Sequence, residues 1–336
     1  MRLPLALTMG EPAGVGGELS LMAWSRRATG IPSFFLLDDP ARIAAIARRL
    51  GLDVPIATID APEAANDRFS ESLPVLPISL AKPSEAGRLD PANAGAVLEA
   101  IRRAVEFTRS GRAGGVVTNP IHKHVLYKAG FKHPGHTEYL AELAAENGRT
   151  PMPVMMLACP ELRVVPVTIH LPIKRAIADL TTGMIVETGE IVARDLARRF
   201  GKARPRLAVA GLNPHAGEGG SLGKEDDEIV RPAVEALKRL GIDATGPWAP
   251  DSMFHADARA GYDAALCMYH DQALIPIKTL DFHGGVNVTL ALPFIRTSPD
   301  HGTALDIAGS GRANPASLIA ALKLASTMAE ASAGRA

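Results

Sequence analysis

The sequence predicts an α/β protein, in which a mostly parallel sheet lies between two layers of helices. Short apolar, β-branched runs recur along the 336 residues, as in strands buried on both faces, and helix-length segments separate them. Glycine (31 residues) and proline (26 residues) cluster at the ends of these runs and form no low-complexity blocks. At about 150 residues per domain, the length suggests either one large domain with a cleft or two domains. Because no flexible linker is visible, we expect the chain to cross between them more than once.

The glycines and prolines at the ends of the apolar runs mark the bounds of each expected element. The expected strands are 3–8, 34–37, 115–118, 154–158, 164–169, 207–210, 264–268 and 286–290. The expected helices are 92–109, 137–146, 185–199, 225–240 and 316–329. Such alternation is typical of an α/β/α sandwich.

Composition excludes several classes of protein. Lysine plus arginine (36) balances aspartate plus glutamate (36), and aromatic residues make up only 4%, so nucleic acid is not an expected partner. No apolar run approaches the roughly 18 residues of a membrane span, and the first residues do not resemble a signal peptide. Cys159 and Cys267 lie far apart in unrelated contexts, which favours neither a disulfide framework nor a metal knuckle. We therefore expect a cytoplasmic enzyme.

Common nucleotide-binding signatures are absent. Gly14 and Gly16 begin a dinucleotide fingerprint, but Leu19 stands where the third glycine should be. Gly223-Lys224 is followed by Glu225, which does not fit a phosphate-binding P-loop. The glycines of residues 10–17 still form a loop between a strand and a helix. That loop either approaches an anion through its N–H groups or is simply a tight turn.

Three histidines occupy equivalent places in the predicted topology. His170, His215 and His270 each stand at or just past the end of an expected strand. The carboxyl ends of strands converge on the ligand crevice of an open α/β sheet. Three imidazoles with one open position are a familiar ligand set for a catalytic divalent metal. The alternative is that each is a hydrogen-bonded turn residue.

A second group of residues suits an anion. Lys278, Asn287 and Arg296 follow His270 in a glycine-containing, otherwise apolar region, where a carboxylate or phosphate could bind. The alternative is a set of solvated surface charges. His136 and Thr137 stand in a turn that leads into a helix, and we expect Thr137 to be its N-cap. We interpret the acidic run 225–228 as structural, because it falls on the first turns of a helix.

Four longer motifs carry a resemblance to a known family. They are Pro134-Gly-His-Thr-Glu138, Gly211-Leu-Asn-Pro-His-Ala-Gly-Glu-Gly-Gly220, Met268-Tyr-His-Asp-Gln272 and the stretch 292–304. Together they resemble the PdxA family, the 4-hydroxythreonine-4-phosphate dehydrogenases of pyridoxal 5'-phosphate biosynthesis, over essentially the whole chain. One departure is Ile121-His122-Lys123, where the family commonly has Asn before the Lys, which puts in doubt only the role of that loop.

A second resemblance concerns the cofactor. Residues 301–315 look like the adenosine-binding stretch of isopropylmalate and isocitrate dehydrogenases, which are similar to the PdxA family in fold. This resemblance implies two domains with a cleft between them, a cofactor-side domain of residues 1–130 with 291–336 and a metal, substrate and dimerisation domain of residues 131–290. It also implies cofactor contacts from His301, Asp306 and Asn314. The acidic Asp306 favours NAD, with NADP as the alternative.

The resemblance to PdxA then implies a role for each site residue. It assigns a divalent metal (zinc, magnesium or cobalt) to His170, His215 and His270, and substrate contacts to His136, Thr137, Lys278, Asn287 and Arg296. Asp251 and Asp271 are candidates for proton transfer or for orienting a ligand. The family works as a homodimer with a shared site, so ligands are expected from both chains.

The implied reaction is an oxidative decarboxylation. 4-Phosphooxy-L-threonine is oxidised by NAD to 2-amino-3-oxo-4-(phosphooxy)butanoate, which loses carbon dioxide to give 3-amino-2-oxopropyl phosphate. The nearest alternative is a related metal-dependent dehydrogenase acting on a four-carbon sugar-acid phosphate or a cis-dihydrodiol carboxylate. A non-catalytic metal- or phosphate-binding protein and a metal hydrolase are more distant alternatives, because both would leave the cofactor stretch unused.

Overall fold

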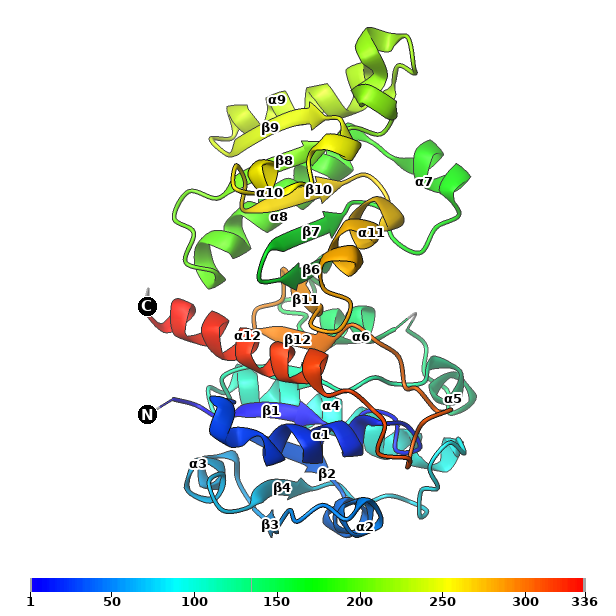
Figure 1. The fold of residues 1–336 in the computed structure, drawn as a ribbon, viewed down its shortest axis with the longest axis vertical. Helices are drawn as coiled ribbons and strands as arrows, with labels where there is room; N and C mark the ends of the chain where they lie inside the picture. Colours follow the sequence, from blue (N-terminus) through cyan, green and yellow to red (C-terminus); the bar gives the residue numbers. More distant parts are fainter. Residues whose placement is uncertain (1, 134, 335–336) are drawn as a thin grey trace. The chain divides into compact units, whose positions relative to one another are not determined.

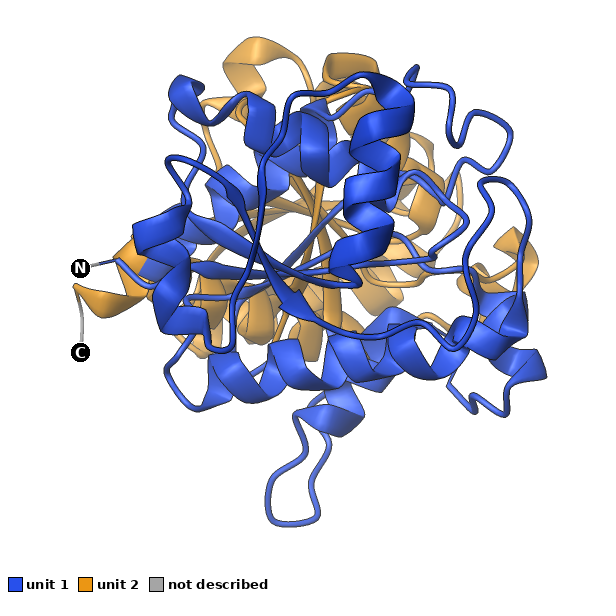
Figure 2. Cartoon of the chain, turned by 90° about the horizontal axis from the view of Figure 1, so that it is seen from below, with its two compact units in different colours: residues 1–153, 292–329 blue, residues 154–291, 330–336 orange. Residues whose placement is uncertain are grey.

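The computed structural model describes residues 2–133 and 135–334 and divides the chain into two units. Unit 1 comprises Met1–Pro153 with Leu292–Ala329, and unit 2 comprises Val154–Ala291 with Glu330–Ala336 (Figure 2). The chain therefore leaves unit 1 and returns to it. Residues 131–153, which we expected in the second domain, belong to unit 1, because Leu140, Ala141 and Ala144 pack into its core.

Unit 1 is built on a parallel sheet with the strand order β3-β4-β2-β1-β5-β12 (Figure 1). Its strands are β1 (Leu5–Thr8), β2 (Phe34–Asp38), β3 (Ile56–Thr58), β4 (Leu73–Pro77), β5 (Val116–Thr118) and β12 (Arg296–Pro299). Its helices are α1 (Gly16–Ser25), α2 (Pro40–Leu50), α3 (Ala65–Arg68), α4 (Ala94–Arg109), α5 (Lys123–Lys128), α6 (His136–Leu143) and α12 (Ala316–Ala333), of which the part up to Ala329 belongs to unit 1. Helices lie on both faces of the strands.

Local chemistry explains these elements. Every residue of β1 and β2 is buried, as expected of strands covered on both faces. Helix α2 begins at the Asp39 cap, whose carboxylate accepts from two backbone N–H groups, and it ends at Gly51 in the left-handed conformation. Helix α4 buries Val97, Ile101 and Ala104 at helical spacing against the core of unit 1.

Unit 2 has the strand order β11-β6-β7-β10-β8-β9. Its strands are β6 (Val154–Cys159), β7 (Leu162–Pro166), β8 (Arg206–Ala210), β9 (Asp243–Trp248), β10 (Ala264–Cys267) and β11 (Val286–Leu290). β6 runs antiparallel to both of its neighbours, and β7, β10, β8 and β9 are parallel. Its helices are α7 (Ile173–Asp179), α8 (Thr182–Arg199), α9 (Arg231–Arg239), α10 (Ala256–Arg259) and α11 (His270–Leu280). In Figure 1, α11 lies in front of the strands and α8 behind them.

Two expected elements of unit 2 differ in the structure. The strand expected at 164–169 is β7, which ends at Pro166. The helix expected at 225–240 is a π-helical turn, Asp226–Val230, followed by α9. The three-layer α/β/α architecture itself is confirmed. No helix within 2–133 or 135–334 is long and apolar enough to span a membrane.

Candidate active site

The three candidate metal ligands of unit 2 follow neighbouring strands. In the order β7-β10-β8, the strand before His270 lies between the strands before His170 and His215. Because these strands are parallel, the three segments leave the sheet at the same edge. The ring centroids of His170 and His270 lie 5.7 Å apart. The predicted topological equivalence of the three histidines is therefore present in the structure.

His170 lies in a loop and not at the end of a strand. Beyond β7, the backbone N–H groups of Val167 and Thr168 donate to the carbonyls of Cys267 and Met268. The Thr168 hydroxyl also donates to the Met268 carbonyl, at 2.7 Å. His170 itself is exposed and has φ 51°, which is uncommon for a residue other than glycine. The loop is therefore anchored just before His170, and the imidazole is left accessible.

His215 stands in a tight left-handed segment, Pro214–Gly220. Its φ is 53°, and its side chain is exposed. The buried carboxylate of Asp226 holds the start of this loop, because it accepts from the N–H groups of Leu212 and Asn213 at 2.7 and 3.0 Å. A side chain at Gly211 would meet Asp226 Oδ1 at 2.9 Å, so the close approach requires glycine. The acidic run that we interpreted as structural supplies the residue that shapes this loop.

His270 is the first residue of α11 and is partly exposed. Its Nδ1 lies 2.8 Å from Asp271 Oδ1. With the proton on Nδ1, the ring donates to Asp271, and Nε2 keeps the electron pair that a metal requires. Asp271 thus has the contact expected of a residue that orients a ligand. The other candidate, Asp251, is exposed in the 3-10 turn Pro250–Ser252.

The donor set fits a divalent metal only in part. His170 and His270 offer two neighbouring imidazoles, and imidazole suits zinc, cobalt and related ions. Among the described residues of this single chain, no three histidine, cysteine or carboxylate side chains gather closely enough to form a complete site. To hold a metal, the two neighbouring imidazoles would need a further donor, for which His215 is the remaining candidate.

The candidate substrate residues belong to both units. Lys278 is on α11 and Asn287 is on β11, in unit 2, whereas His136, Thr137 and Arg296 are in unit 1. The Lys278 ammonium lies 5.4 Å from the centre of the Phe282 ring. Asn287 Oδ1 is buried, and no hydrogen-bond donor reaches it from the described residues.

Arg296 is a buried cation at the start of β12, only 3% exposed. One of its terminal nitrogens donates to the Thr118 hydroxyl at 2.8 Å, which directs the side chain along β5. Burial lowers the pKa of Arg296 to about 10, and it therefore remains charged at neutral pH. The alternative of a solvated surface charge is excluded for Arg296.

His136 opens α6 and does not carry an ordinary histidine charge. Burial, and then the positive charges of Arg296 and Lys123, lower the pKa of His136 well below its usual range. Part of the residue remains accessible, but Nε2 is buried and has no hydrogen-bond partner within the described part of the chain. A neutral imidazole with a buried nitrogen beside two cations is suited to receive an anion and a proton together.

Thr137 is not the N-cap that we predicted. Helix α6 begins one residue earlier, at His136, its cap position is Gly135, and no side chain caps it. A side chain at Gly135 would meet Lys123 Cε at 3.1 Å and Nζ at 3.2 Å, so the lysine lies against the start of the helix. Pro134, the first residue of this motif, is outside the described residues. Thr137 therefore has no capping role.

In unit 1, the buried side chain of Glu18 anchors the expected cofactor stretch, residues 301–315. Both carboxylate oxygens of buried Glu18 accept backbone N–H groups, from Gly309 and Gly311. His301 and Asp306 are exposed. Asn314 Oδ1 accepts the N–H of Ala316, a contact that stabilises the start of α12. The structure thus assigns Asn314 a local structural contact, whereas His301 and Asp306 remain accessible.

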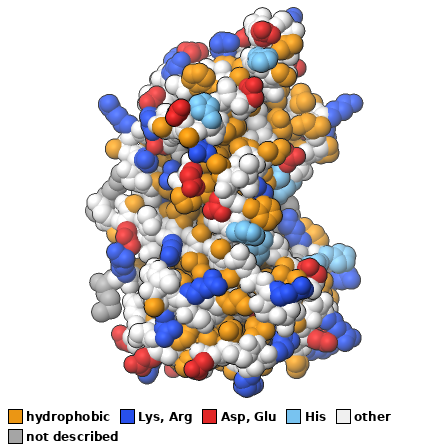
Figure 3. Space-filling model, viewed as in Figure 1, with side chains coloured by type: hydrophobic (Ala, Val, Ile, Leu, Met, Phe, Trp, Pro, Cys, Tyr) orange, Lys and Arg blue, Asp and Glu red, His pale blue; other side chains and the backbone are white. Residues whose placement is uncertain are grey.

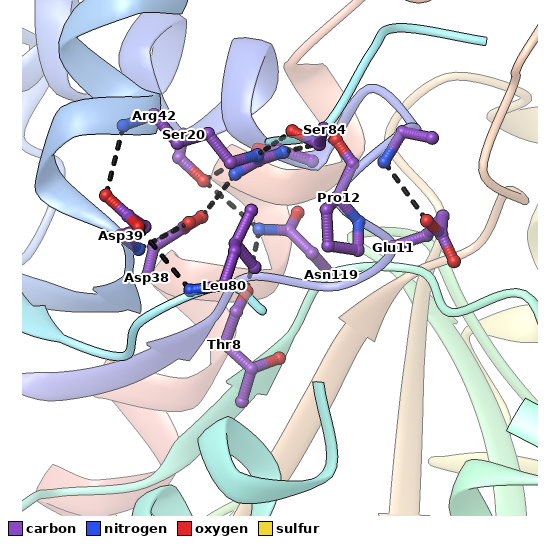
Figure 4. A network of polar contacts seen from close by, with 12 residues as sticks. Thr8, Glu11, Pro12, Ser20, Asp38, Asp39, Arg42, Leu80, Ser84 and Asn119 are labelled. Atoms are coloured by element: carbon purple, nitrogen blue, oxygen red, sulfur yellow. Dashed lines mark hydrogen bonds and ion pairs between the residues drawn. The ribbon is translucent and has the colours of Figure 1, made fainter. Parts of the chain in front are cut away.

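A buried network fixes the glycine loop next to this stretch (Figure 4). Arg42 forms an ion pair with Asp38 at 2.6 Å and donates to the Pro12 carbonyl at 2.7 Å and the Ser84 hydroxyl at 3.2 Å. Two cavities flank this contact, of about 500 Å³ and about 310 Å³. Arg49 and Lys82 line the larger one. Residues of the loop 10–17 therefore form part of the wall of both cavities.

Sequence reasoning missed several residues that shape the site. Lys123 appeared only as part of a departure from the family, although its charge acts on His136. Gln272 was the unassigned end of the Met268–Gln272 motif, and Glu18 and Arg42 lie on helices with no evident signature. A buried charge in an apolar face was the only available signal for the last two.

Comparisons with known proteins agree with this architecture. The family model described as "Pyridoxal phosphate biosynthetic protein PdxA" matches residues 31–325. A protein named 4-hydroxythreonine-4-phosphate dehydrogenase from Bradyrhizobium diazoefficiens is 58% identical, over 98% of this chain and 97% of its own. The crystal structure of 4-hydroxythreonine-4-phosphate dehydrogenase from Klebsiella pneumoniae has a TM-score of 0.88 at 35% identity, over 98% of both chains.

A more distant structure shares the fold alone. It is a terephthalate 1,2-cis-dihydrodiol dehydrogenase from Burkholderia xenovorans, with a TM-score of 0.65 at 24% identity, over 97% of this chain and 98% of that one. The motifs around His136, His215, His270 and Arg296 and the match along most of the chain agree with one another. The chain belongs to the PdxA family.

Proposed function

We propose that this protein is a metal-dependent dehydrogenase that oxidises 4-phosphooxy-L-threonine with NAD to 2-amino-3-oxo-4-(phosphooxy)butanoate, which decarboxylates to 3-amino-2-oxopropyl phosphate. The supporting observation is the sheet edge of unit 2, where His170 and His270 approach to 5.7 Å on neighbouring strand ends. Family membership supports the reaction class, because the relatives are named as dehydrogenases of this substrate.

His170, His215 and His270 would hold the divalent metal: zinc, magnesium or cobalt. When bound, such an ion supplies a Lewis acid that lowers the pKa of the substrate hydroxyl and polarises the ketone that forms. Asp271 fixes the ring of His270 through its 2.8 Å contact with Nδ1. Asp251 and Asp271 remain the candidates for accepting the hydroxyl proton.

The substrate carries a phosphate and a carboxylate, and the chain offers donors for both. Arg296 provides a buried, permanently charged fork, and His136 provides a neutral ring that gains a proton beside an anion. Thr137 lies in the first turn of α6, where free N–H groups favour negative charge. In unit 2, Lys278 supplies a further donor, and the buried amide oxygen of Asn287 supplies an acceptor for the hydroxyl or amine of the substrate.

We assign cofactor binding to unit 1 and metal binding to unit 2. His301 and Asp306 are exposed on the stretch that Glu18 anchors, and the Asp306 carboxylate would accept ribose hydroxyls and repel a 2'-phosphate. Asn314 remains a weaker candidate, because its amide oxygen already accepts from Ala316. NAD is therefore the proposed cofactor, with NADP as the alternative.

We also propose a homodimer with a shared site in the cytoplasm. Large apolar side chains are exposed near two of the candidate ligands in the chain: Leu171, Ile173 and Ile177 follow His170, and Ile275, Leu280 and Phe282 follow His270. Figure 3 shows hydrophobic side chains on the surface of this unit. A second copy would cover this surface and complete the incomplete ligand set. Cys159 and Cys267 are both buried, free thiols, as suits a reducing compartment.

The test is a steady-state assay of NADH formation with three substrates, on the metal-loaded and the metal-stripped protein. We expect turnover of 4-phosphooxy-L-threonine, loss of turnover after chelation, and recovery with added zinc, cobalt or magnesium. Faster turnover of a four-carbon sugar-acid phosphate or a cis-dihydrodiol carboxylate would replace the substrate in this proposal. NADH binding without turnover of any substrate would favour a non-catalytic protein.

A further inference from the structure

Residues 303–311 of the expected cofactor stretch lead into a series of turns in unit 1. Within this segment, the Ile307 N–H donates to the Ala304 carbonyl and the Ser310 N–H donates to the Ile307 carbonyl, both at 3.2 Å. Hydrogen bonds of this kind shape a turn but do not connect it to the rest of the fold. The position of the segment therefore depends on the contacts that its two ends make with other elements.

The loop before helix α1 holds the start of this segment. The Val15 N–H donates to the Thr303 carbonyl at 3.1 Å. A side chain at Gly14 would meet the same carbonyl at 2.8 Å, so the two backbones are in close contact at this point. These are contacts between backbone groups, and a change of side chain on α1 would therefore leave them in place.

The side chain of Glu18 holds the other end. It lies on α1, is only 1% exposed, and its two carboxylate oxygens accept the N–H groups of Gly309 and Gly311. Hydrogen bonds to a carboxylate are stronger than those between neutral groups, because the acceptor is charged. Asp306, the proposed acceptor for the ribose hydroxyls, stands between the two anchored ends.

We propose that Glu18 is a positioning residue, which holds residues 303–311 in place before the cofactor binds and so keeps Asp306 available to the ribose. The proposal rests on the proposed cofactor role of residues 301–315. Glu18 acts on the cofactor only through the backbone of Gly309 and Gly311. A segment that is already ordered loses less conformational freedom when a ligand binds, so the affinity is higher.

Two variants remove this anchor to different degrees. Glu18→Ala removes both acceptor oxygens. Glu18→Gln keeps the size of the side chain and one acceptor oxygen, but it sets an amide NH₂ group against the second glycine N–H, so one bond is lost. Ser20→Ala is the matched control, because it also removes buried hydrogen bonds of α1, whose partners Gly16 and Asn119 lie outside residues 303–311.

The readouts are the dissociation constants of NADH and NADPH, from fluorescence titration of the full-length protein, the hydrogen exchange of residues 303–311 without cofactor, and the KM values for NAD and for 4-phosphooxy-L-threonine. We expect Glu18→Ala to bind NADH about 10-fold more weakly and to exchange faster in this segment, with Glu18→Gln between it and the parent. The KM for NAD should rise while the KM for the substrate stays like that of the parent, whereas a general loosening of the fold would raise both.

If both Glu18 variants bind NADH like the parent, if Ser20→Ala weakens binding as much as they do, or if both KM values rise equally, the positioning role is wrong and the proposed function stands. If the parent binds neither NADH nor NADPH, the cofactor site and the positioning role both fall. If Glu18→Ala does not fold, Glu18→Gln alone decides between these results, because it keeps one of the two bonds.

Discussion

The candidate functional residues of the two units differ in their burial and in their charge. In unit 2, the candidate ligands His170 and His215 are exposed in left-handed backbone, and the hydrogen bonds that hold them run through neighbouring peptide groups. In unit 1, Arg296 and the Arg42–Asp38 pair are buried charges in a fixed network. Unit 2 thus presents accessible imidazoles, whereas unit 1 holds buried cations whose desolvation favours an anion beside them. Substitution of these exposed histidines in unit 2 should therefore affect binding without affecting folding, whereas substitution of the buried Arg296 in unit 1 should affect both.

The largest expected effect is the loss of a metal ligand. His270→Ala, His170→Asn and His215→Asn should each reduce turnover by about a thousandfold or more, because two imidazoles make an incomplete metal site. Asparagine is chosen at 170 and 215 because it tolerates positive φ, so the backbone is preserved. Metal content per chain, measured beside dehydrogenase rate and thermal stability, tests this.

The fold should persist in these variants, since a core of this size does not depend on a metal. His255→Ala is the control. This histidine is also exposed in unit 2, but it is not a candidate ligand, and its side chain caps α10. Full metal occupancy in all three ligand variants would show that the histidines are turn residues.

The next effect tests unit 1. Arg296→Lys keeps the charge but loses the fork, and the substrate should bind less favourably by about 1.5–3 kcal/mol. Because Arg296 is buried and bonded to Thr118, the variant should also be less stable, in contrast to the ligand variants of unit 2. KM, kcat and the unfolding midpoint are measured together. Parent-like kinetics with lowered stability would leave Arg296 a purely structural role.

These contrasts also explain what the sequence could predict. Continuous apolar runs such as β1 and β2 were recognisable, because burial on both faces leaves a compositional signal. The strands β3, β4, β9 and β12 were missed. β3 has only three residues, β4 contains two prolines, β9 is largely exposed, and β12 begins with Arg296. Strands of this kind form because they pair with adjacent strands, so their own sequences show no strand-like hydrophobic pattern.

Site residues could be predicted where they stand in long sequence motifs. They could not be predicted where their role depends on contacts with residues far away in the sequence. The histidine positions followed from strand ends, but the loop between β7 and His170 is held by bonds to residues about 100 positions away. The capping role expected of Thr137 failed because propensity alone cannot place a helix start to within a residue. Lys123 acts on His136 through space, which no local sequence pattern records.

A smaller effect is expected from the lowered pKa of His136, which lies beside the buried cation of unit 1. An ordinary histidine titrates near 6.5, whereas burial, Arg296 and Lys123 keep His136 neutral to a lower pH. Below about pH 6.5, the unfolded chain binds a proton that the folded protein refuses, so His136 lowers stability increasingly, by about 1.4 kcal/mol per pH unit, until its own lowered pKa is reached. Titration of the His136 ring by NMR tests this.

Lys123→Gln should raise the pKa of His136 part of the way to its ordinary value, because it removes one of the two cations. His124→Gln, on the same helix, is the matched control and should leave the His136 titration unchanged. An unchanged titration in Lys123→Gln would mean that solvent screens the lysine from the ring.

The smallest expected effect concerns the cofactor. Asp306 is exposed, so solvent screens its charge, and an interaction of this kind is worth about 1 kcal/mol or less. Asp306→Lys should therefore shift the ratio of kcat/KM for NAD and NADP only severalfold toward NADP, by losing the acceptor for the ribose hydroxyls and adding a cation for the 2'-phosphate. Asp67→Lys makes the same change of charge at another exposed aspartate, on α3, and controls for the altered net charge. The shift should also shrink at high salt, because an exposed charge is screened and a buried one such as Arg296 is screened much less. An unchanged cofactor ratio at low salt would remove Asp306 from the cofactor site, and a shift that survives high salt would mean that binding of the cofactor buries this carboxylate.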